Sequence, residues 1–249
     1  MRGSTFISNL RPFFLLFLAA LALLLKTTPT FASDKADEYG ATPFTEYGDF
    51  QDQEDEESDT RFFQYGRFFG VSLGLGFEGI DGNRGRLWQG GFPVVDFKVH
   101  YWFDFSWALD LGVTFASHFF ETSAGNGGHT DVSLIRVGVN LKYYFDTKNV
   151  SAPISFANPF LSIGGGNYTK NQTSSSSGTP DSESGLGFSG GGGLEFAIRP
   201  KKSYFQVEGK MHFIQFLDTS TNIYAGPPNN IDDMTGRFYT LTGSILFTW

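Results

Sequence analysis

The chain has 249 residues with no cysteine, 31 glycines, 17% aromatic residues and a formal net charge of −8. The absence of cysteine excludes disulfides, thiolate metal sites and a lipid-modified cysteine near the N-terminus. The low content of charged residues, 18%, together with the many glycines and aromatic residues, is typical of a β-rich domain with sharp turns.

The N-terminus has the features of a secretory signal peptide. Arg2 and Arg11 precede an unbroken apolar run over residues 13–25, and the small residues Thr30 and Ala32 precede a cleavage point after Ala32. The run is too short for a membrane-spanning helix, which needs about 20 residues. We therefore expect residues 1–32 to be removed, and an uncleaved anchor is the alternative.

Residues 33–61 form a separate acidic segment. Residues 33–60 carry 11 of the 26 acidic residues of the chain and a single base, Lys35. Low hydrophobicity and repulsion between like charges predict a disordered periplasmic tail. A solvated spacer is the simplest function of such a tail, and binding of cations or of a basic partner is the alternative. From Arg61 onward the chain is nearly neutral, so the net charge of the protein belongs to the tail.

Eight segments with alternating apolar and polar or small residues follow, within residues 62–249. They lie at residues 69–78, 95–104, 107–116, 135–145, 159–168, 188–198, 204–213 and 238–249. One face of each segment is bulky and apolar, whereas the other carries ionisable residues in mid-strand. About 10 residues in a strand tilted by about 45° span a bilayer core. The fifth segment has the weakest alternation.

The connections between these segments alternate in length. Residues 78–92, 120–130, 169–185 and 218–236 form long polar loops, whereas residues 104–106 and 200–203 form tight turns. Residues 147–157 form a connection of medium length. Long outer loops and short periplasmic turns are the asymmetry of bacterial outer-membrane barrels. The sequence therefore predicts an all-β protein, an eight-stranded antiparallel transmembrane β-barrel with an up-and-down meander.

The predicted barrel belongs in the outer membrane of a Gram-negative bacterium, with both barrel termini in the periplasm. Trp249 ends the last segment, and a terminal aromatic residue fits the rim of a barrel, where aromatic rings lie at the membrane interface. The interface aromatics predicted for the periplasmic side are Tyr101, Phe103, Trp107, Tyr143, Phe145, Phe247 and Trp249.

Residues 62–249 resemble the small outer-membrane barrel family that includes the transmembrane domains of OmpA-type proteins and the OmpX-like proteins. The shared features are the signal peptide, the eight strands, the glycine-rich segments at residues 164–166 and 190–196, and the terminal aromatic residue. The resemblance implies outer-membrane lipid and the barrel-assembly machinery as partners, with extracellular ligands contacting the outer loops. Because no peptidoglycan-binding domain follows the barrel in this sequence, we do not expect a tethering role.

The inward face of the predicted barrel carries a polar network. The interior of eight strands is just wide enough for side chains, and an isolated buried charge is costly. We therefore expect a filled, ion-paired lumen, and a conducting pore is the alternative. The residues of the predicted network are Asp96, Lys98, His100, Asp110, Arg136, Lys142, Glu195, Glu208 and Lys210.

One contact within this network can be predicted from the register. If residues 104–106 form a three-residue turn, Phe103 faces Trp107 across the hairpin. His100 then lies opposite Asp110, and the two side chains point into the lumen together.

Other functional patterns in the sequence are weak. Residues 74–79 match the glycine pattern of dinucleotide-binding sites, but the residues that follow indicate a loop instead of the helix that would hold a pyrophosphate. His118 and His129, with Ser117 and Asp131, lie near the outer ends of their segments without a nucleophile–base spacing. A basic patch for nucleic acid is lacking.

We therefore expect no enzyme activity, catalytic residue, cofactor or metal. The expected role is structural, or an interaction at the cell surface through the outer loops. A narrow pore for small solutes or ions is the first alternative, and a lipid-modifying enzyme is the second.

Overall fold

The computed structural model describes residues 66–122, 128–145, 157–174, 180–218, 231 and 233–249. The described residues fall within one compact unit. The predicted signal peptide, residues 1–32, and acidic tail, residues 33–61, lie outside the described residues.

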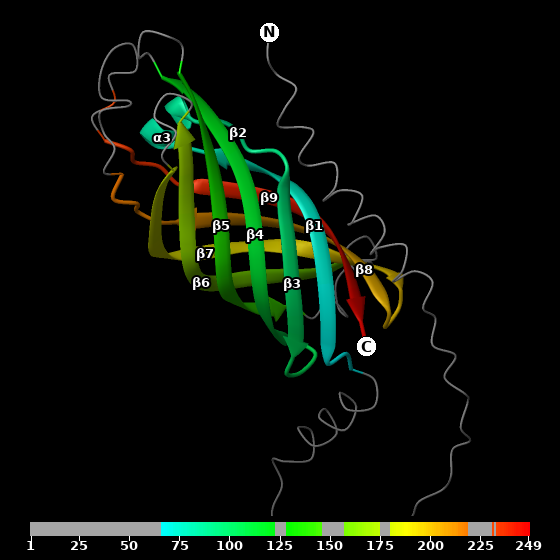
Figure 1. Cartoon of the computed structure of the whole chain (residues 1–249). Coiled ribbons are helices and arrows are strands. Elements are labelled where there is room, and N and C mark those ends of the chain that lie inside the picture. Colours follow the sequence, from blue (N-terminus) through cyan, green and yellow to red (C-terminus); the bar gives the residue numbers. More distant parts are fainter. Residues whose placement is uncertain (1–65, 123–127, 146–156, 175–179, 219–230, 232) are drawn as a thin grey trace, which may run out of the picture. The chain divides into compact units, whose positions relative to one another are not determined.

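The described chain consists almost entirely of strands, with one short helix, as Figure 1 shows. The elements in chain order are β1 (Phe69–Ile80), α3 (Gly82–Leu87), β2 (Gln89–Gly90), β3 (Val94–Trp102), β4 (Trp107–Thr122), β5 (Gly128–Tyr144), β6 (Ala157–Ser174), β7 (Pro180–Arg199), β8 (Ser203–Phe213) and β9 (Phe238–Thr248). No helix among the described residues is long and apolar enough to cross a membrane.

The eight long strands close into a barrel. Each pairs antiparallel with its neighbours along the chain, and β1 closes the ring by pairing with β9 from Gly70↔Thr248 to Ile80↔Phe238. The two-residue strand β2 adds to the outer end of β4. The N–H of Phe69 donates to the carbonyl of Trp249, so both barrel ends lie at one rim. The predicted eight-stranded up-and-down barrel is confirmed.

Four strands are longer than the sequence pattern predicts. β4, β5, β6 and β7 have 16, 17, 18 and 20 residues, so most of the expected outer loops at residues 120–130 and 169–185 is strand. The sequence-based prediction ended these strands too early, because it required apolar residues on the outward face. Beyond the lipid, strand pairing continues with polar residues on both faces, and the alternation disappears.

Glycines bring neighbouring strands and inward rings close together. A Cβ on Gly166 of β6 would lie 2.3 Å from the carbonyl oxygen of Val137, and one on Gly187 of β7 would lie 2.8 Å from the ring of Tyr168. These close approaches need residues without a side chain. Backbone pairing with β5 and β7 thereby holds the weakly alternating fifth segment as the 18-residue strand β6.

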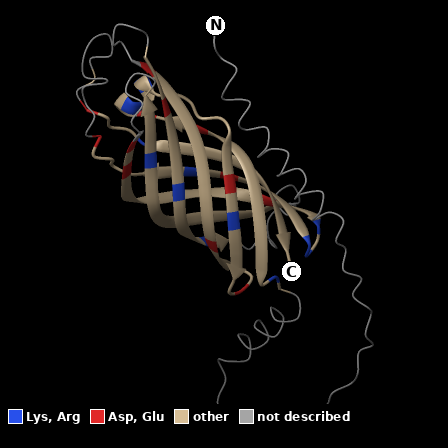
Figure 2. Cartoon of the chain, in the orientation of Figure 1, with Lys and Arg blue, Asp and Glu red and all other residues tan. Residues whose placement is uncertain are grey.

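The barrel reverses the usual distribution of polarity in a soluble domain. Its outer wall exposes large apolar side chains, which include Leu111, Val137, Leu161 and Ile163, in a band that faces lipid. Charged residues lie within the strands, as the blue and red segments of the ribbon in Figure 2 show, and many of their side chains are buried. Two apolar clusters flank this charged centre, around Trp88 and Phe238 at the outer end and around Trp102 and Phe160 at the periplasmic end.

Candidate functional site: the closed lumen

The strand parity directs all nine residues of the predicted network into the lumen. Asp96, Lys98, His100, Asp110, Arg136, Lys142, Glu195 and Glu208 are buried, and the side chain of Lys210 is 8% exposed. Each one has an ion-pair partner in the lumen. Eight of them fall into three groups along the lumen, and Glu195 belongs to a closure at the periplasmic end.

The first group is built on the pair that the hairpin register predicts. His100 pairs with Asp110 across β3 and β4, and its Nδ1 lies 2.6 Å from Asp110 Oδ1. Lys142 Nζ lies 2.8 Å from the other carboxylate oxygen, Oδ2. Ser72 Oγ lies 2.8 Å from His100 Nε2. The predicted contact between His100 and Asp110 is therefore confirmed.

Ser72, His100 and Asp110 together have the contact order of a nucleophile, a base and an orienting acid. All three side chains are buried in the lumen, and Lys142 neutralises the carboxylate. A nucleophile needs room for a substrate about 3 Å away, next to donors that stabilise the oxyanion. The three residues form a buried hydrogen-bond chain inside the barrel.

The second group is centred on Lys98. Its Nζ lies 2.6 Å from Asp96 Oδ2 and donates to Glu208 Oε2 at 2.5 Å. Lys210 Nζ lies 3.2 Å from Glu208 Oε1, and Ser162 Oγ donates to the same oxygen at 3.1 Å. This group connects β3, β6 and β8 across the lumen, so it braces the walls of the barrel against each other.

The third group lies toward the outer end and includes a residue that we did not place in the network. Glu78 of β1 pairs with Arg136 of β5, and its Oε1 lies 2.8 Å from His118 Nε2. The sequence places Glu78 on the inward parity of β1, at the end of the alternating segment. This inward parity was the sequence signal for its place in the lumen.

Arg67 closes the periplasmic end of the lumen. Its Nη1 donates to Glu195 Oε1 at 2.6 Å, and the hydroxyl of Tyr144 donates to the other carboxylate oxygen at 3.1 Å. The guanidinium carbon lies 4.3 Å from the ring centroid of Trp102 and 4.5 Å from that of Tyr204. Arg67 precedes β1, so the parity of the strands gave no signal for its inward position.

Arg84 closes the outer end of the lumen in a similar way. Its Nη2 donates to Asp218 Oδ2 at 2.6 Å, and its guanidinium carbon lies 5.4 Å from the ring centroid of Phe238. Lys170 Nζ lies 2.5 Å from Asp218 Oδ1 and 2.9 Å from Glu183 Oε2. These contacts join the connection between β1 and β3 to β6, to β7 and to the segment after β8.

The connection predicted at residues 78–92 is long, as expected, but it is not a solvated polar loop. The segment contains α3 and β2, and it places Arg84, Leu87 and Trp88 in the buried cluster at the barrel mouth. Residues 86–88, which are Arg, Leu and Trp, carried a signal that this segment packs into the barrel mouth. Large apolar side chains such as Leu and Trp are usually buried instead of exposed in a solvated loop.

The described ion pairs of the lumen balance in charge. Seven acids and seven bases take part in them: Glu78, Asp96, Asp110, Glu183, Glu195, Glu208 and Asp218 with Arg67, Arg84, Lys98, Arg136, Lys142, Lys170 and Lys210. Between the two closures lies a cavity of about 40 Å³, lined by Lys98, Arg136 and Glu208 among others. This volume holds a few water molecules at about 10–15 Å³ each.

The residues considered for a lipid-modifying enzyme do not converge. His118 is buried in the lumen beside Glu78, whereas His129 is exposed and lies 3.1 Å from Asp131. Ser117 has the outward parity of β4, opposite to that of His118. Among the described residues, no group of three His, Cys, Asp or Glu could hold a metal ion.

The glycine pattern at residues 74–79 lies within strand β1. The residues after it, which we expected to be a loop, form the six-residue helix α3. This correction does not create a nucleotide site, because α3 belongs to the closure of the barrel mouth through Arg84 and Leu87. The glycines allow close strand packing, since a Cβ on Gly76 would lie 2.2 Å from the carbonyl oxygen of Leu241.

The predicted interface aromatics face outward near the periplasmic rim. Neighbouring rings contact each other, with centroids 5.1 Å apart for Tyr101 and Phe103 and 4.8 Å apart for Trp107 and Tyr143. The exposed members of the predicted set are Tyr101, Phe103, Trp107, Tyr143, Phe145 and Trp249, and Phe247 is half-buried. Phe69, which the prediction did not include, joins this ring 5.2 Å from Tyr101.

An apolar outer wall, a closed ring of strands and a buried ionic interior together define a transmembrane β-barrel of the outer-membrane type. Residues 18–204, more than half of the chain, match the model of the family described as outer membrane protein beta-barrel domain. The chain belongs to this family, and its location is the Gram-negative outer membrane. A search of curated proteins gives no match to the sequence.

Solved structures of small outer-membrane barrels are similar in fold. Neisserial surface protein A is 13% identical with a TM-score of 0.50, and the alignment covers 73% of this chain and 97% of that one. The attachment invasion locus protein Ail of Yersinia pestis, solved with a heparin analogue, is 14% identical with a TM-score of 0.41 over 73% and 99% of the two chains. The N-terminal barrel domain of Pseudomonas aeruginosa OprF is 12% identical with a TM-score of 0.39 over 72% and 97%.

Proposed function

We propose that this protein is a non-conducting outer-membrane barrel that presents surface hairpins to partners outside the cell. The observation that carries the proposal is the double closure of the lumen, by Arg67 with Glu195 at one end and by Arg84 with Asp218 at the other. The proposal assigns no catalytic step to the protein.

The closures support a lumen without a continuous water path. Each arginine contacts a carboxylate and aromatic rings. An ion that enters the lumen at either end therefore meets a cationic group and bulky side chains. Opening an end requires separation of a buried ion pair, and breaking such a pair by removing one partner costs about 3–5 kcal/mol. The paired lumen between the closures braces the barrel, which is a structural function.

The long strands supply the surface for interaction. A 20-residue strand at about 3.3 Å per residue and a tilt of about 40° rises roughly 50 Å, compared with an apolar band of about 25 Å. The outward residues at the outer ends of β5, β6 and β7 are polar, and they include Asp131, Asn171 and Ser182. Polar outward residues are unfavourable in lipid. These strand ends therefore extend beyond the membrane as two hairpins, β4–β5 and β6–β7.

A narrow pore is the second candidate function. The observation that favours it is that each closure depends on one arginine, from a segment that is not itself a barrel strand. Movement of residue 67 and of the segment around α3 would remove the arginines from both ends of the lumen. The two candidates predict different conductances for the unmodified protein.

Conductance in a planar bilayer separates the two candidates. We expect the protein purified from outer membranes, with heat-modifiable gel mobility as the test of folding, to give no steady discrete openings. Discrete openings of the unmodified, folded protein would overturn the proposal in favour of the pore. The double variant Arg67→Ala/Arg84→Ala is the positive test of the closures, and Arg199→Ala, an exposed arginine outside the lumen, is the matched control.

A further inference from the structure

The side chains around Arg67 form a cage for its guanidinium group. The guanidinium carbon lies 4.3 Å from the ring centroid of Trp102, 4.5 Å from that of Tyr204 and 5.3 Å from that of Tyr144. Glu195 supplies the anion and accepts a hydrogen bond from Arg67 Nη1 at 2.6 Å. We call Trp102, Tyr144, Tyr204 and Glu195 the arginine cage. Aromatic rings around a carboxylate favour the binding of an organic cation, and of a planar guanidinium in particular.

The barrel wall builds the arginine cage without help from the arginine. The four cage residues come from β3, β5, β7 and β8. The ring of Trp102 stacks on that of His100, with centroids 5.5 Å apart. The hydroxyl of Tyr204 accepts a hydrogen bond from the backbone N–H of Lys201 at 3.0 Å, and the hydroxyl of Tyr144 donates to the cage carboxylate at 3.1 Å. Because each ring has a contact of its own, we expect the cage to keep its shape when the arginine leaves.

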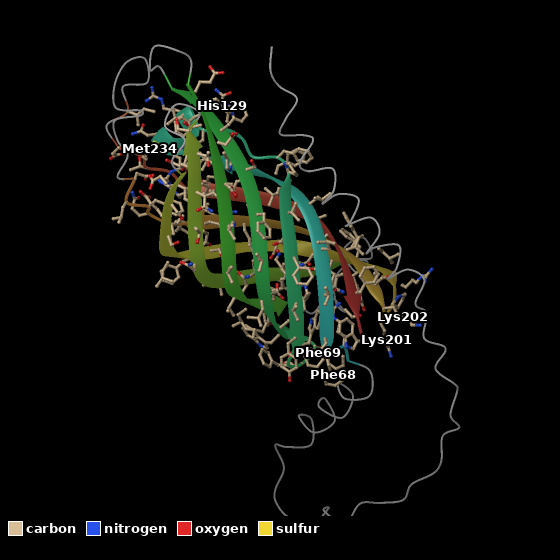
Figure 3. All side chains as sticks on the ribbon, in the orientation of Figure 1. Phe68, Phe69, His129, Lys201, Lys202 and Met234 are labelled. Atoms are coloured by element: carbon tan, nitrogen blue, oxygen red, sulfur yellow. The ribbon has the colours of Figure 1, made fainter. Side chains whose placement is uncertain are left out.

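Arg67 enters the arginine cage from outside the strands. The described backbone hydrogen bonds that tie this segment to the barrel begin at Phe68, whose carbonyl accepts from the N–H of Trp102 at 3.0 Å. The side chain of Arg67 is 16% exposed, whereas each cage residue is 8% exposed or less. Arg67 therefore covers the cage on the periplasmic side, the end at which Figure 3 shows Phe68 and Lys201. Rotation at residue 67 uncovers the cage without loss of strand pairing.

Polar groups beside the cage have hydrogen-bonding capacity that Arg67 does not use. Gln206 lies opposite Glu195 in the register of β7 and β8, and it is 1% exposed. Among the described residues, neither polar atom of its amide has a hydrogen-bond partner, and the same holds for the indole nitrogen of Trp102. A guanidinium has five N–H donors, so one that is not tethered to the segment before β1 has donors for both the carboxylate and the Gln206 amide oxygen.

We propose that the arginine cage is a binding site for guanidinium groups that come from the periplasm. Arg67 fills the site from within the chain, and an external guanidinium fills it when residue 67 moves out. The ligand is an arginine side chain of another polypeptide or a small alkylguanidinium compound, because both present the same planar fork to the carboxylate and the rings. The proposal goes beyond the function proposed above, since it concerns the periplasmic end of the barrel and not the surface hairpins.

Chemical rescue of Arg67→Ala tests the site. Ethylguanidinium supplies the atoms that this substitution removes. We expect it to restore the urea unfolding midpoint of Arg67→Ala in lipid vesicles in a saturable manner, with half of the effect at a roughly millimolar concentration, as befits so small a ligand. Butylammonium, which has the same charge but no planar fork, should have little effect. Equal restoration by the two cations, or none by either, would overturn the proposal.

Two control variants and a third probe complete the rescue experiment. Arg67→Ala/Glu195→Gln should not respond to ethylguanidinium, because the cage has lost its anion. Arg199→Ala, at an exposed arginine, should neither lose stability nor respond. N-acetylarginine amide separates the two sources of the ligand. If it restores stability as ethylguanidinium does, the site accepts an arginine of a polypeptide; if ethylguanidinium alone does so, the site accepts small compounds.

A spin label tests the site in a protein that keeps Arg67. The chain has no cysteine, so Gly66→Cys gives a single labelling position next to the arginine. We expect excess ethylguanidinium to increase the mobility of this label, because Arg67 leaves the cage, and butylammonium at the same concentration to leave it unchanged. A label at Arg199→Cys should respond to neither cation. A label at residue 66 that responds equally to both cations, or to neither, would contradict exchange at the cage.

Discussion

Arg67 and Glu195, 128 positions apart in the chain, form an ion pair of 2.6 Å at the periplasmic end of the barrel. The pair joins the segment before β1 to the periplasmic part of the glycine-rich strand β7. It connects the closure of the lumen to the point where the chain enters the barrel, because Arg67 is two residues from the start of β1.

Replacement of Arg67 tests the contribution of this closure to stability. Arg67→Ala leaves the Glu195 carboxylate buried without its cation, and we expect a loss of about 3 kcal/mol in the free energy of unfolding. Urea titration in lipid vesicles, followed by the heat-modifiable gel shift, measures the change. The double variant Arg67→Ala/Glu195→Gln should recover part of the loss, because no charge remains unpaired. Unchanged stability of Arg67→Ala would show that the ion pair contributes nothing.

The central pair gives a second stability prediction. Asp110→Asn removes the acceptor shared by His100 and Lys142, and it leaves the lysine ammonium buried. We expect a loss of about 3 kcal/mol in vesicle-based urea unfolding. Asp131→Asn, at an exposed position beside His129, is the matched control and should stay within about 0.5 kcal/mol of wild type. Similar losses in both variants would contradict a specific role for the lumen network.

The two closures act in series along the lumen. We expect Arg67→Ala and Arg84→Ala to be silent singly in planar bilayers, because each variant keeps one closed end. The double variant should give small, discrete openings that the single variants lack. Openings in either single variant would show that the other closure is leaky, and silence of a folded double variant would show that other side chains block the lumen.

Labelling of intact cells tests the position of the long hairpins. A cysteine at Asp131 or Ser182, in the outer parts of β5 and β7, should react with a membrane-impermeant maleimide on whole cells. A cysteine at Lys201, in the turn at the opposite end of the barrel, should react only after the outer membrane is permeabilised. Figure 3 shows Lys201 and Lys202 at the end that carries Phe68 and Phe69, away from His129 and Met234. Reversed reactivity would overturn the orientation.

Asp81 gives a prediction about pH. The backbone N–H of Arg237 and the hydroxyl of Tyr239 donate to its carboxylate and hold the pKa of Asp81 below its ordinary value of 3.8. The contribution of this group to stability is therefore fully present above pH 3.8 and is lost as the pH falls through the lower, folded-state pKa. Asp81→Asn should remove this acid-dependent part of the unfolding free energy, measured between pH 5 and pH 2. An unchanged acid dependence in the variant would contradict the assignment.

The sequence by itself determined the wall of the barrel. In the lipid-spanning part the two faces of each strand meet opposite environments, so the parity of residues such as Val137 and Arg136 is fixed by solvation alone. The same parity and one tight turn were enough to pair His100 with Asp110. The lengths and the alternation of the segments also predicted eight strands, although the glycines of β6 leave little alternation in that strand.

Only the tertiary structure decided how the lumen is closed and how far the strands extend. Arg67 and Arg84 lie outside the regular strands, where no periodicity predicts direction, and their partners Glu195 and Asp218 are distant in sequence. The choice of partner depends on distances across a closed ring, which exist only once all strands are paired. The outer parts of β6 and β7 are polar on both faces, so backbone hydrogen bonds between strands, not side-chain patterns, hold them.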